Sequence, residues 1–207
     1  MRLSWNLLDI FAWVVVILYL LFIAQNIRKR HLRMIINDRK RFAAKTFVLD
    51  LVQILILAAG VGYLLQVAFF DDPNLTDKSV VTSRIEYRPL ILTASSGHSY
   101  YVTATSKQKT TPVQSYTIYY DSRKITVNSR YATISSDRDP LSIAASVMPY
   151  SHKALLKADS HYQRAYTAVF SATYKDTWRN GLGLHAGRMA SQYYLIRVPD
   201  TTFIRRN

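Results

Sequence analysis

The sequence predicts an α-helical transmembrane hairpin at the N-terminus, followed by a mainly β extracytoplasmic domain with a sandwich or barrel-like fold. Two long apolar runs lie within the first 70 residues, a short basic segment joins them, and the composition changes sharply after Phe70. Thirteen of the 15 tyrosines fall in 71–207, among many threonines and serines. The predicted boundaries are 1–70 for the hairpin, 71–80 for a linker and 81–207 for the domain.

The first apolar run is long enough to cross a bilayer. The span predicted at about 7–27 covers about 31 Å as a helix, close to the thickness of the hydrocarbon core. Eleven of the 15 residues in 10–24 are Ile, Leu, Phe or Val, which favours insertion by about 3–7 kcal/mol. A cleaved signal peptide fits less well, because only Arg2 precedes the run and a basic stop-transfer flank replaces an A-x-A site.

The second span is predicted at about 47–70, and two such runs argue against buried helices of a soluble protein. Ala58 and Gly62 form a small-xxx-small pair, so we expect close packing there against the first span or a second copy. Asp9 and Asp50 stand at the ends of the runs. We therefore expect them to snorkel or to complement a helix N-terminus, Asp50 from the first turn, rather than to carry protons inside the membrane.

The connection between the spans sets the predicted topology. Residues 28–45 hold eight basic residues and one acid, a net charge of +7, whereas the outer flanks are poor in Lys and Arg. The positive-inside rule places this loop in the cytoplasm, with both termini and the C-terminal domain outside the plasma membrane. The basic residues fix this topology or contact lipid headgroups, and they are Arg28, Lys29, Arg30, Arg33, Arg39, Lys40, Arg41 and Lys45. We expect the loop to continue the two helices.

Alternating β-branched and aromatic residues predict strands in the domain, separated by turn signals such as Asp121-Ser122. A short helix is expected within 140–156. Tyrosines spread over the strands are expected to pack at the core edge with satisfied hydroxyls, in preference to a platform for a glycan. The predicted strands are Ile85–Thr93, Tyr100–Thr105, Tyr116–Tyr120, Ile125–Asn128, Ala165–Tyr174 and Tyr193–Val198.

Charge and motifs narrow the function without fixing it. Residues 71–207 carry 18 Lys/Arg against 10 Asp/Glu, a net +8 that suits an anionic partner or simple solubility. Five arginines gather in the last thirty residues: Arg179, Arg188, Arg197, Arg205 and Arg206. The chain has no cysteine, no metal-ligand spacing among its histidines and no P-loop, H-E-x-x-H or G-x-S-x-G motif, so no catalytic residue, metal or cofactor is predicted.

The segment 178–188 is the most distinctive string. Asn180-Gly181 is predicted to form a turn, and Gly183 and Gly187 to allow bulges or close backbone approach. A ligand loop there would use Arg179, Asn180, His185 and Arg188.

The opening Trp5-Asn6-Leu7-Leu8 and Phe11-Ala12-Trp13-Val14-Val15, together with the glycine-rich string, resemble small two-span membrane proteins of lactic acid bacteria. The resemblance covers most of the chain. It implies a Gram-positive plasma membrane and no known activity, so it assigns no functional residue.

The leading hypothesis is a non-enzymatic envelope protein whose basic domain binds a partner protein or an anionic wall polymer, with no role for nucleic acid. The first alternative is a membrane-tethered enzyme acting on wall or lipid-linked glycans. The second is an accessory subunit whose hairpin packs against another membrane protein.

Overall fold

The structure is a computed structural model that describes residues 5–37, 44–70, 74–95, 97–106, 113–143 and 145–206. The chain divides into two compact units. The first, the hairpin unit, comprises 1–73 together with 174–188. The second, the β domain, comprises 74–173 and 189–207. The predicted domain 81–207 includes residues 174–188, whereas in the structure this segment belongs to the hairpin unit.

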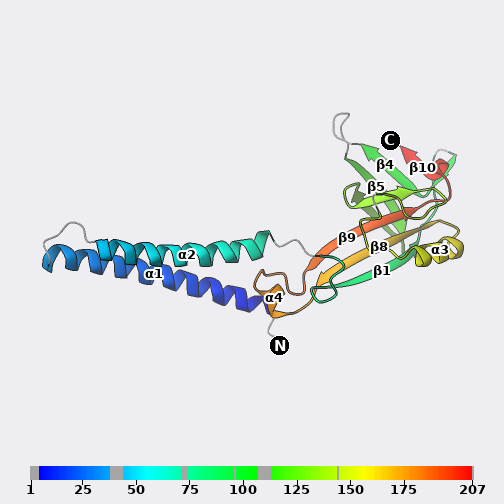
Figure 1. Cartoon of the computed structure of the whole chain (residues 1–207). Coiled ribbons are helices and arrows are strands. Elements are labelled where there is room, and N and C mark those ends of the chain that lie inside the picture. Colours follow the sequence, from blue (N-terminus) through cyan, green and yellow to red (C-terminus); the bar gives the residue numbers. More distant parts are fainter. Residues whose placement is uncertain are drawn as a thin grey trace. The chain divides into compact units, whose positions relative to one another are not determined.

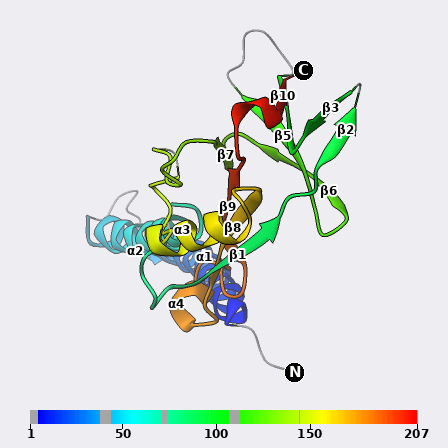
Figure 2. The ribbon, with the colours of Figure 1, turned by 90° about the vertical axis from the view of Figure 1, so that its right-hand side faces the viewer.

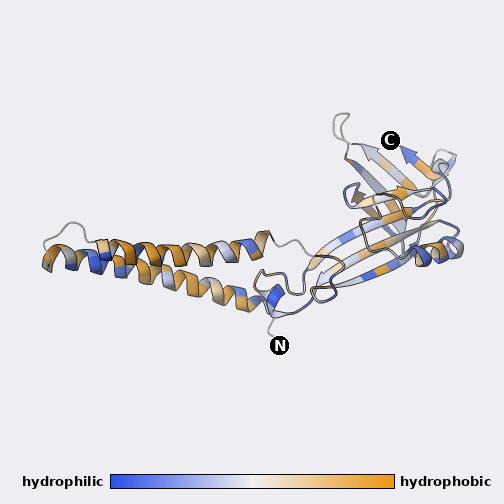
Figure 3. Ribbon diagram, in the orientation of Figure 1, coloured by the Kyte–Doolittle hydropathy of each residue, from blue (hydrophilic) through white to orange (hydrophobic). Residues whose placement is uncertain are grey.

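Two long helices form the hairpin (Figure 1): α1, Asn6–Asn37, and α2, Ala44–Phe69. Both are long and apolar enough to cross a membrane, over Asn6–Arg33 and Ala44–Phe69. Only 11% of each span is buried within the protein, unlike the core helices of a soluble protein, and apolar residues run along both (Figure 3). The expected transmembrane hairpin is therefore confirmed as an architecture.

The helices continue into the basic connection, as expected. Arg28, Lys29, Arg30 and Arg33 lie in α1, and Lys45 lies in α2. The predicted headgroup residues Arg39, Lys40 and Arg41 lie outside the described residues.

Because α2 begins at Ala44, Asp50 lies in its second turn, and the prediction that it complements the dipole from the first turn is wrong. Asp9 does lie in the first turn of α1.

The β domain contains two four-stranded sheets and a two-stranded hairpin (Figure 2). The first sheet has the order β1-β8-β9-β7 and the second the order β10-β4-β5-β6. The elements are β1 (Val81–Pro89), β2 (Thr93–Ser95), β3 (His98–Tyr100), β4 (Val102–Ser106), β5 (Gln114–Tyr120), β6 (Arg123–Asn128), β7 (Ala132–Ser135), α3 (His152–His161), β8 (Tyr166–Tyr174), β9 (Met189–Arg197), the 3-10 turn Thr201–Phe203 and β10 (Ile204–Arg206).

Strand β9 is buried on both faces, because its side chains alternate between two clusters. Tyr193 and Leu195 pack with Leu155 of α3, whereas Tyr194 and Ile196 pack with residues of the second sheet such as Ile118. The domain therefore has three layers: α3, the first sheet and the second sheet. Among the described residues the two sheets stay separate and no barrel closes, so of the two predicted forms the sandwich is the one observed.

Several predicted boundaries shift for physical reasons. The strand expected over Ile85–Thr93 ends at Pro89, which has no N–H to continue a ladder, and Thr93 begins β2. Asp121 and Ser122 have positive φ angles and connect β5 to β6, which confirms the predicted turn. The short helix expected within 140–156 is α3, which begins at His152 and continues to His161.

Candidate functional site

An open groove of about 540 Å³ lies between the second sheet and the first half of β9. Residues 125–128 of β6 form one wall, and residues 189–192 of β9 form the other. Tyr131 and Tyr194 complete the lining. None of the lining side chains is charged, so the groove offers apolar contact and neutral hydrogen-bonding groups.

The β6 wall is a free strand edge. β6 is the last strand of its sheet, and the N–H of Ser129 donates to the carbonyl of Gln114 in β5 at 2.8 Å. Because the direction of backbone groups alternates along a strand, the N–H and C=O groups of Lys124, Thr126 and Asn128 point away from β5. Those of Lys124 and Thr126 are available to another strand, whereas the carbonyl of Asn128 accepts from the N–H of Tyr131 at 2.9 Å.

The β9 wall is also unpaired on its groove side. The N–H of Tyr194 donates to the carbonyl of Tyr131, and that of Val198 to Ser135, so every second residue of β9 faces β7. β7 begins opposite Tyr194. Gln192, two residues earlier, therefore turns its N–H and C=O to the same side at a point where no described strand pairs with it. Two free edges thus line one groove.

The electrostatics of the groove are those of neutral groups. Burial and the neighbouring Tyr194 hydroxyl raise the pKa of Tyr120, which packs behind the groove, to about 12.

A second hollow of about 320 Å³ lies beside α3 and is lined by Tyr87, Ala154, Lys157, Ala158, His161 and Tyr162. None of these lining residues carries a carboxylate.

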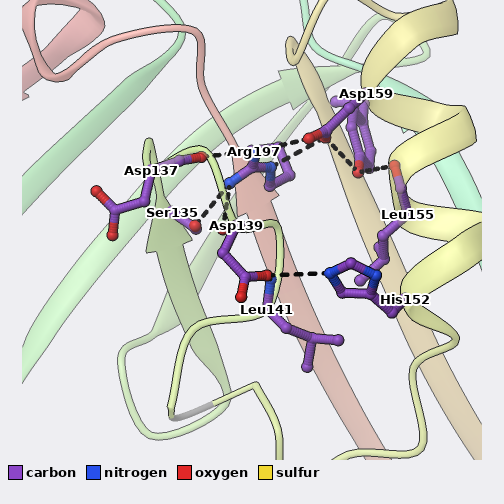
Figure 4. Close-up of polar contacts among 9 residues, drawn as sticks. Ser135, Asp137, Asp139, Leu141, His152, Leu155, Asp159 and Arg197 are labelled. Carbon is purple, nitrogen blue, oxygen red and sulfur yellow. Dashed lines mark hydrogen bonds and ion pairs between the residues drawn. The ribbon is translucent and has the colours of Figure 1, made fainter.

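Arg197 lies at the centre of a buried polar cluster in the β domain (Figure 4). It is fully buried, and its Nε and Nη2 donate to the two carboxylate oxygens of Asp159 at 3.0 and 2.7 Å. Its remaining N–H groups donate to the Ser135 hydroxyl and to the carbonyls of Asp137 and Asp139. All five guanidinium donors are therefore used, and Arg197 cannot reach an anionic polymer as its place in the sequence had suggested.

The same cluster satisfies the hydroxyl group of the buried Tyr166. The hydroxyl of Tyr166 donates to Asp159 Oδ1 at 2.9 Å and also lies 3.2 Å from the carbonyl oxygen of Leu155. Burial and the hydrogen bond to this carboxylate raise the pKa of Tyr166. For Tyr166 the expected role, a packed ring with a satisfied hydroxyl, is confirmed. The cluster joins α3 to the first sheet and to the loop after β7, which is a structural role.

The residues predicted for a ligand loop lie in the hairpin unit, in the cap segment, defined as residues 174–188. Asn180 is buried, and its side chain donates to the carbonyl of Lys175 at 2.8 Å. His185 stacks on Tyr174 with ring centroids 4.9 Å apart. Arg179 and Arg188 are exposed. Asn180-Gly181 forms the end of the one-turn helix α4, Trp178–Gly181, instead of the predicted turn.

The cap segment packs on both helices of the hairpin. The amide of Asn6 in α1 donates to the carbonyl of Ala186 at 3.0 Å and accepts from its N–H at 3.1 Å. A Cβ on Gly181 would lie 2.4 Å from the carbonyl oxygen of Trp5, and one on Gly183 would lie 2.7 Å from that of Val67 in α2. The close backbone approach expected at Gly183 is therefore present. The sequence gives no indication of the residues that Gly181 and Gly183 contact, because Trp5 and Val67 lie more than 100 positions away along the chain.

The two acidic residues of the hairpin have different surroundings. Asp50 is nearly buried and lies 3.0 Å from both Arg30 Nη1 and His31 Nε2 of α1. Asp9 is 0% exposed, and neither carboxylate oxygen accepts a hydrogen bond of ordinary geometry from the described residues. The side chains of Trp13 and His185 interact electrostatically with the Asp9 carboxylate. Both acidic side chains are thus covered by other residues of the protein.

Ala58 and Gly62 are exposed, and a Cβ on Gly62 would meet nothing within 4 Å. They do not pack against α1, and among the described residues no protein group covers this face of α2. Among the described residues no group of three or more His, Asp or Glu side chains could hold a metal ion.

These features define a two-span membrane protein with a β-rich domain. A family model with the description ":-like" matches residues 4–205, and the chain belongs to that family. The description names no activity or ligand. The expected membership of a family without a known activity is thereby confirmed, and an origin in lactic acid bacteria stays a prediction. Comparisons with the curated proteins and with the solved structures find no match.

Proposed function

We propose that this chain is a non-enzymatic cell-envelope protein of a Gram-positive plasma membrane. The hairpin anchors the β domain outside the membrane, and the groove between β6 and β9 binds an extended segment of a partner protein. The observation that carries the proposal is the pair of free strand edges lining one groove, since an added strand satisfies such edges with main-chain hydrogen bonds.

The groove supports a protein partner over an anionic wall polymer. Its lining has no cationic side chain, and Arg197, which the sequence offered as a polymer contact, is committed to Asp159. Teichoic-acid phosphates would instead require arginine or lysine donors within the site. A peptide backbone supplies the donors and acceptors that the free N–H and C=O groups of Thr126 and Gln192 need.

The test combines a photo-crosslinker with a block of one edge. A crosslinking residue at Met189, which is exposed on the groove wall, is introduced into the full-length chain in cells. We expect a protease-sensitive adduct that Thr126→Pro reduces at least fivefold, because proline removes an N–H that points into the groove and leaves the β5 ladder intact.

Thr126→Ala is the matched control, since it also loses the hydroxyl contact with Thr117 but keeps the N–H, and it should preserve the adduct. An unchanged melting temperature for both variants shows that the domain is folded. An adduct that is insensitive to the proline, or one that survives protease digestion and contains wall polymer, would overturn the proposal.

The proposed orientation rests on the +7 charge of residues 28–45. Because the chain has no cysteine, single cysteines at the exposed Ile143 and Lys45 report the side of the membrane without a background signal. We expect a membrane-impermeant maleimide to label Ile143→Cys in intact protoplasts and Lys45→Cys only after lysis. The reverse pattern would contradict this topology.

A second function, an accessory subunit of a membrane complex, is favoured by the exposed Ala58 and Gly62 on α2. The two functions are compatible, because one uses the β domain and the other the lipid-facing side of the hairpin.

A further inference from the structure

The cap segment turns aromatic and cationic side chains outward. Trp178 of α4 is 54% exposed and Trp5, at the start of α1, is 45% exposed. Arg179 and Arg188 are exposed as well, while Asn180, Gly181, Gly183 and Ala186 are buried against the helices. The segment thus has an inner side of small residues that packs on the hairpin and an outer side of tryptophan and arginine.

This end of the hairpin carries all three tryptophans of the chain. Trp5 immediately precedes α1, Trp13 lies about two turns into it, and Trp178 lies in α4, which contacts α1 and whose Gly181 packs against Trp5. Phe69 and Phe70, both strongly exposed, close the same end of α2 beyond Val67, whose carbonyl faces Gly183. Tryptophan and arginine are the residues that membrane proteins place where hydrocarbon meets headgroups.

The opposite end of the hairpin has a different composition. It carries Arg28, Lys29 and Arg30 and no tryptophan. The apolar surfaces of α1 and α2 extend from that basic end to the exposed aromatic residues at the capped end. The outer side of the cap segment is therefore continuous with the lipid-facing surface of the helices.

We infer that the cap segment is a membrane-interface anchor: Trp178 inserts at the boundary between acyl chains and headgroups, and Arg179 and Arg188 bind the phosphates of anionic phospholipids. The inference is independent of the groove. It replaces the ligand loop expected from the glycine-rich string with a loop whose glycines allow close packing and whose ligand is the bilayer surface. Arginine is suited to this task because its planar guanidinium binds phosphate with two parallel hydrogen bonds.

The test uses single-tryptophan variants of the full chain, reconstituted in lipid nanodiscs. In the Trp178-only protein, Trp5 and Trp13 are replaced by phenylalanine. We expect brominated phospholipid to quench Trp178 strongly and aqueous iodide to quench it weakly. A tryptophan at Tyr131, exposed in the β domain, placed in a chain with the other three replaced, should show the reverse behaviour. Quenching of Trp178 by iodide alone would overturn the inference.

Lipid selectivity tests the arginines with the same reporter. At equal mole fraction, brominated phosphatidylglycerol should quench Trp178 more than brominated phosphatidylcholine does. Arg179→Gln should reduce the apparent preference about fivefold, since a nearby basic residue contributes about 1 kcal/mol on an anionic surface. Arg206→Gln, in β10, is the control and should leave the preference unchanged. Equal quenching by both lipids in the unmodified chain would overturn the phosphate-binding role.

Discussion

The two ends of the hairpin each bury one carboxylate, but they hold it in opposite ways. At the basic end, Asp50 lies 3.0 Å from two side-chain nitrogens of α1, Arg30 Nη1 and His31 Nε2. At the capped end, Asp9 is fully covered and has no hydrogen bond of ordinary geometry among the described residues. There the chain relies on backbone packing at Gly181 and on the Asn6 amide. Equivalent substitutions at the two ends should therefore act with opposite sign.

The largest effect is expected at the basic end. Asp50→Leu leaves Arg30 without its partner in a partly buried site, and should destabilise the association of α1 with α2 there by about 2–4 kcal/mol. Spin labels on engineered cysteines at Lys29 and Lys45 report the opening of this end as denaturing detergent is added. Adding Arg30→Leu should restore most of the loss, and Arg28→Leu, at an exposed position, should have little effect. Equal stability of Asp50→Leu and the unmodified chain would show that the ion pair contributes nothing.

The packing of the cap segment is tested by one methyl group. Gly181→Ala places a Cβ 2.4 Å from the Trp5 carbonyl oxygen, so the cap must shift, at a cost of about 1–3 kcal/mol. Tryptophan fluorescence reports this change directly, because all three tryptophans lie at the capped end. Gly60→Ala is the matched control: its Cβ meets nothing within 4 Å, and alanine favours the helix by up to about 1 kcal/mol. A cap that tolerates Gly181→Ala as well as it tolerates Gly60→Ala would contradict the observed contact.

Local elements could be predicted from the sequence, but contacts between distant residues could not. The spans were predictable because a bilayer demands about 20 apolar residues in a row, and the second half of β9 because the aromatic and β-branched residues of Tyr193–Val198 predict a strand. The contact of Asn6 with Ala186 joins residues 180 positions apart, and the pairing of Arg197 with Asp159 joins residues 38 apart. An arginine is expected at the surface unless a buried partner is known. Arg197 was therefore counted among possible polymer contacts, because the sequence does not show that Asp159 lies beside it.

The candidate site was predictable only in part. The strand at Ile125–Asn128 and its preceding turn were evident from β-branched residues and Asp121-Ser122, but its position at a sheet edge depends on strand order. Strand β7 was missed because its four residues pair in parallel with β9, a contact about 60 residues away. Its short length is what leaves Gln192 unpaired.

Asp9→Asn tests whether the buried charge at the capped end is destabilising, in contrast to the charge of Asp50 at the basic end. An amide keeps the shape of the side chain and removes a buried charge whose oxygens accept no hydrogen bond of ordinary geometry from the described residues, so the capped end should gain about 1–2 kcal/mol. The measurement is a detergent unfolding titration followed by tryptophan fluorescence. The matched Asp50→Asn should instead lose stability in the spin-label assay. A loss at both ends would show that Asp9, like Asp50, is held by a charged partner.

The smallest effect is expected at Gly62, between the two ends. Gly62→Leu meets open space on the lipid-facing side of α2, so the isolated chain should change by less than about 0.5 kcal/mol in either unfolding assay. If α2 packs against a second copy or another membrane protein through Ala58 and Gly62, the larger side chain separates the backbones and reduces that association without unfolding the hairpin. Crosslinking of the full chain in its own membrane separates the two cases, with Val61→Leu as a control that keeps both small residues. Unchanged oligomers in Gly62→Leu would leave the hairpin with an anchoring role alone.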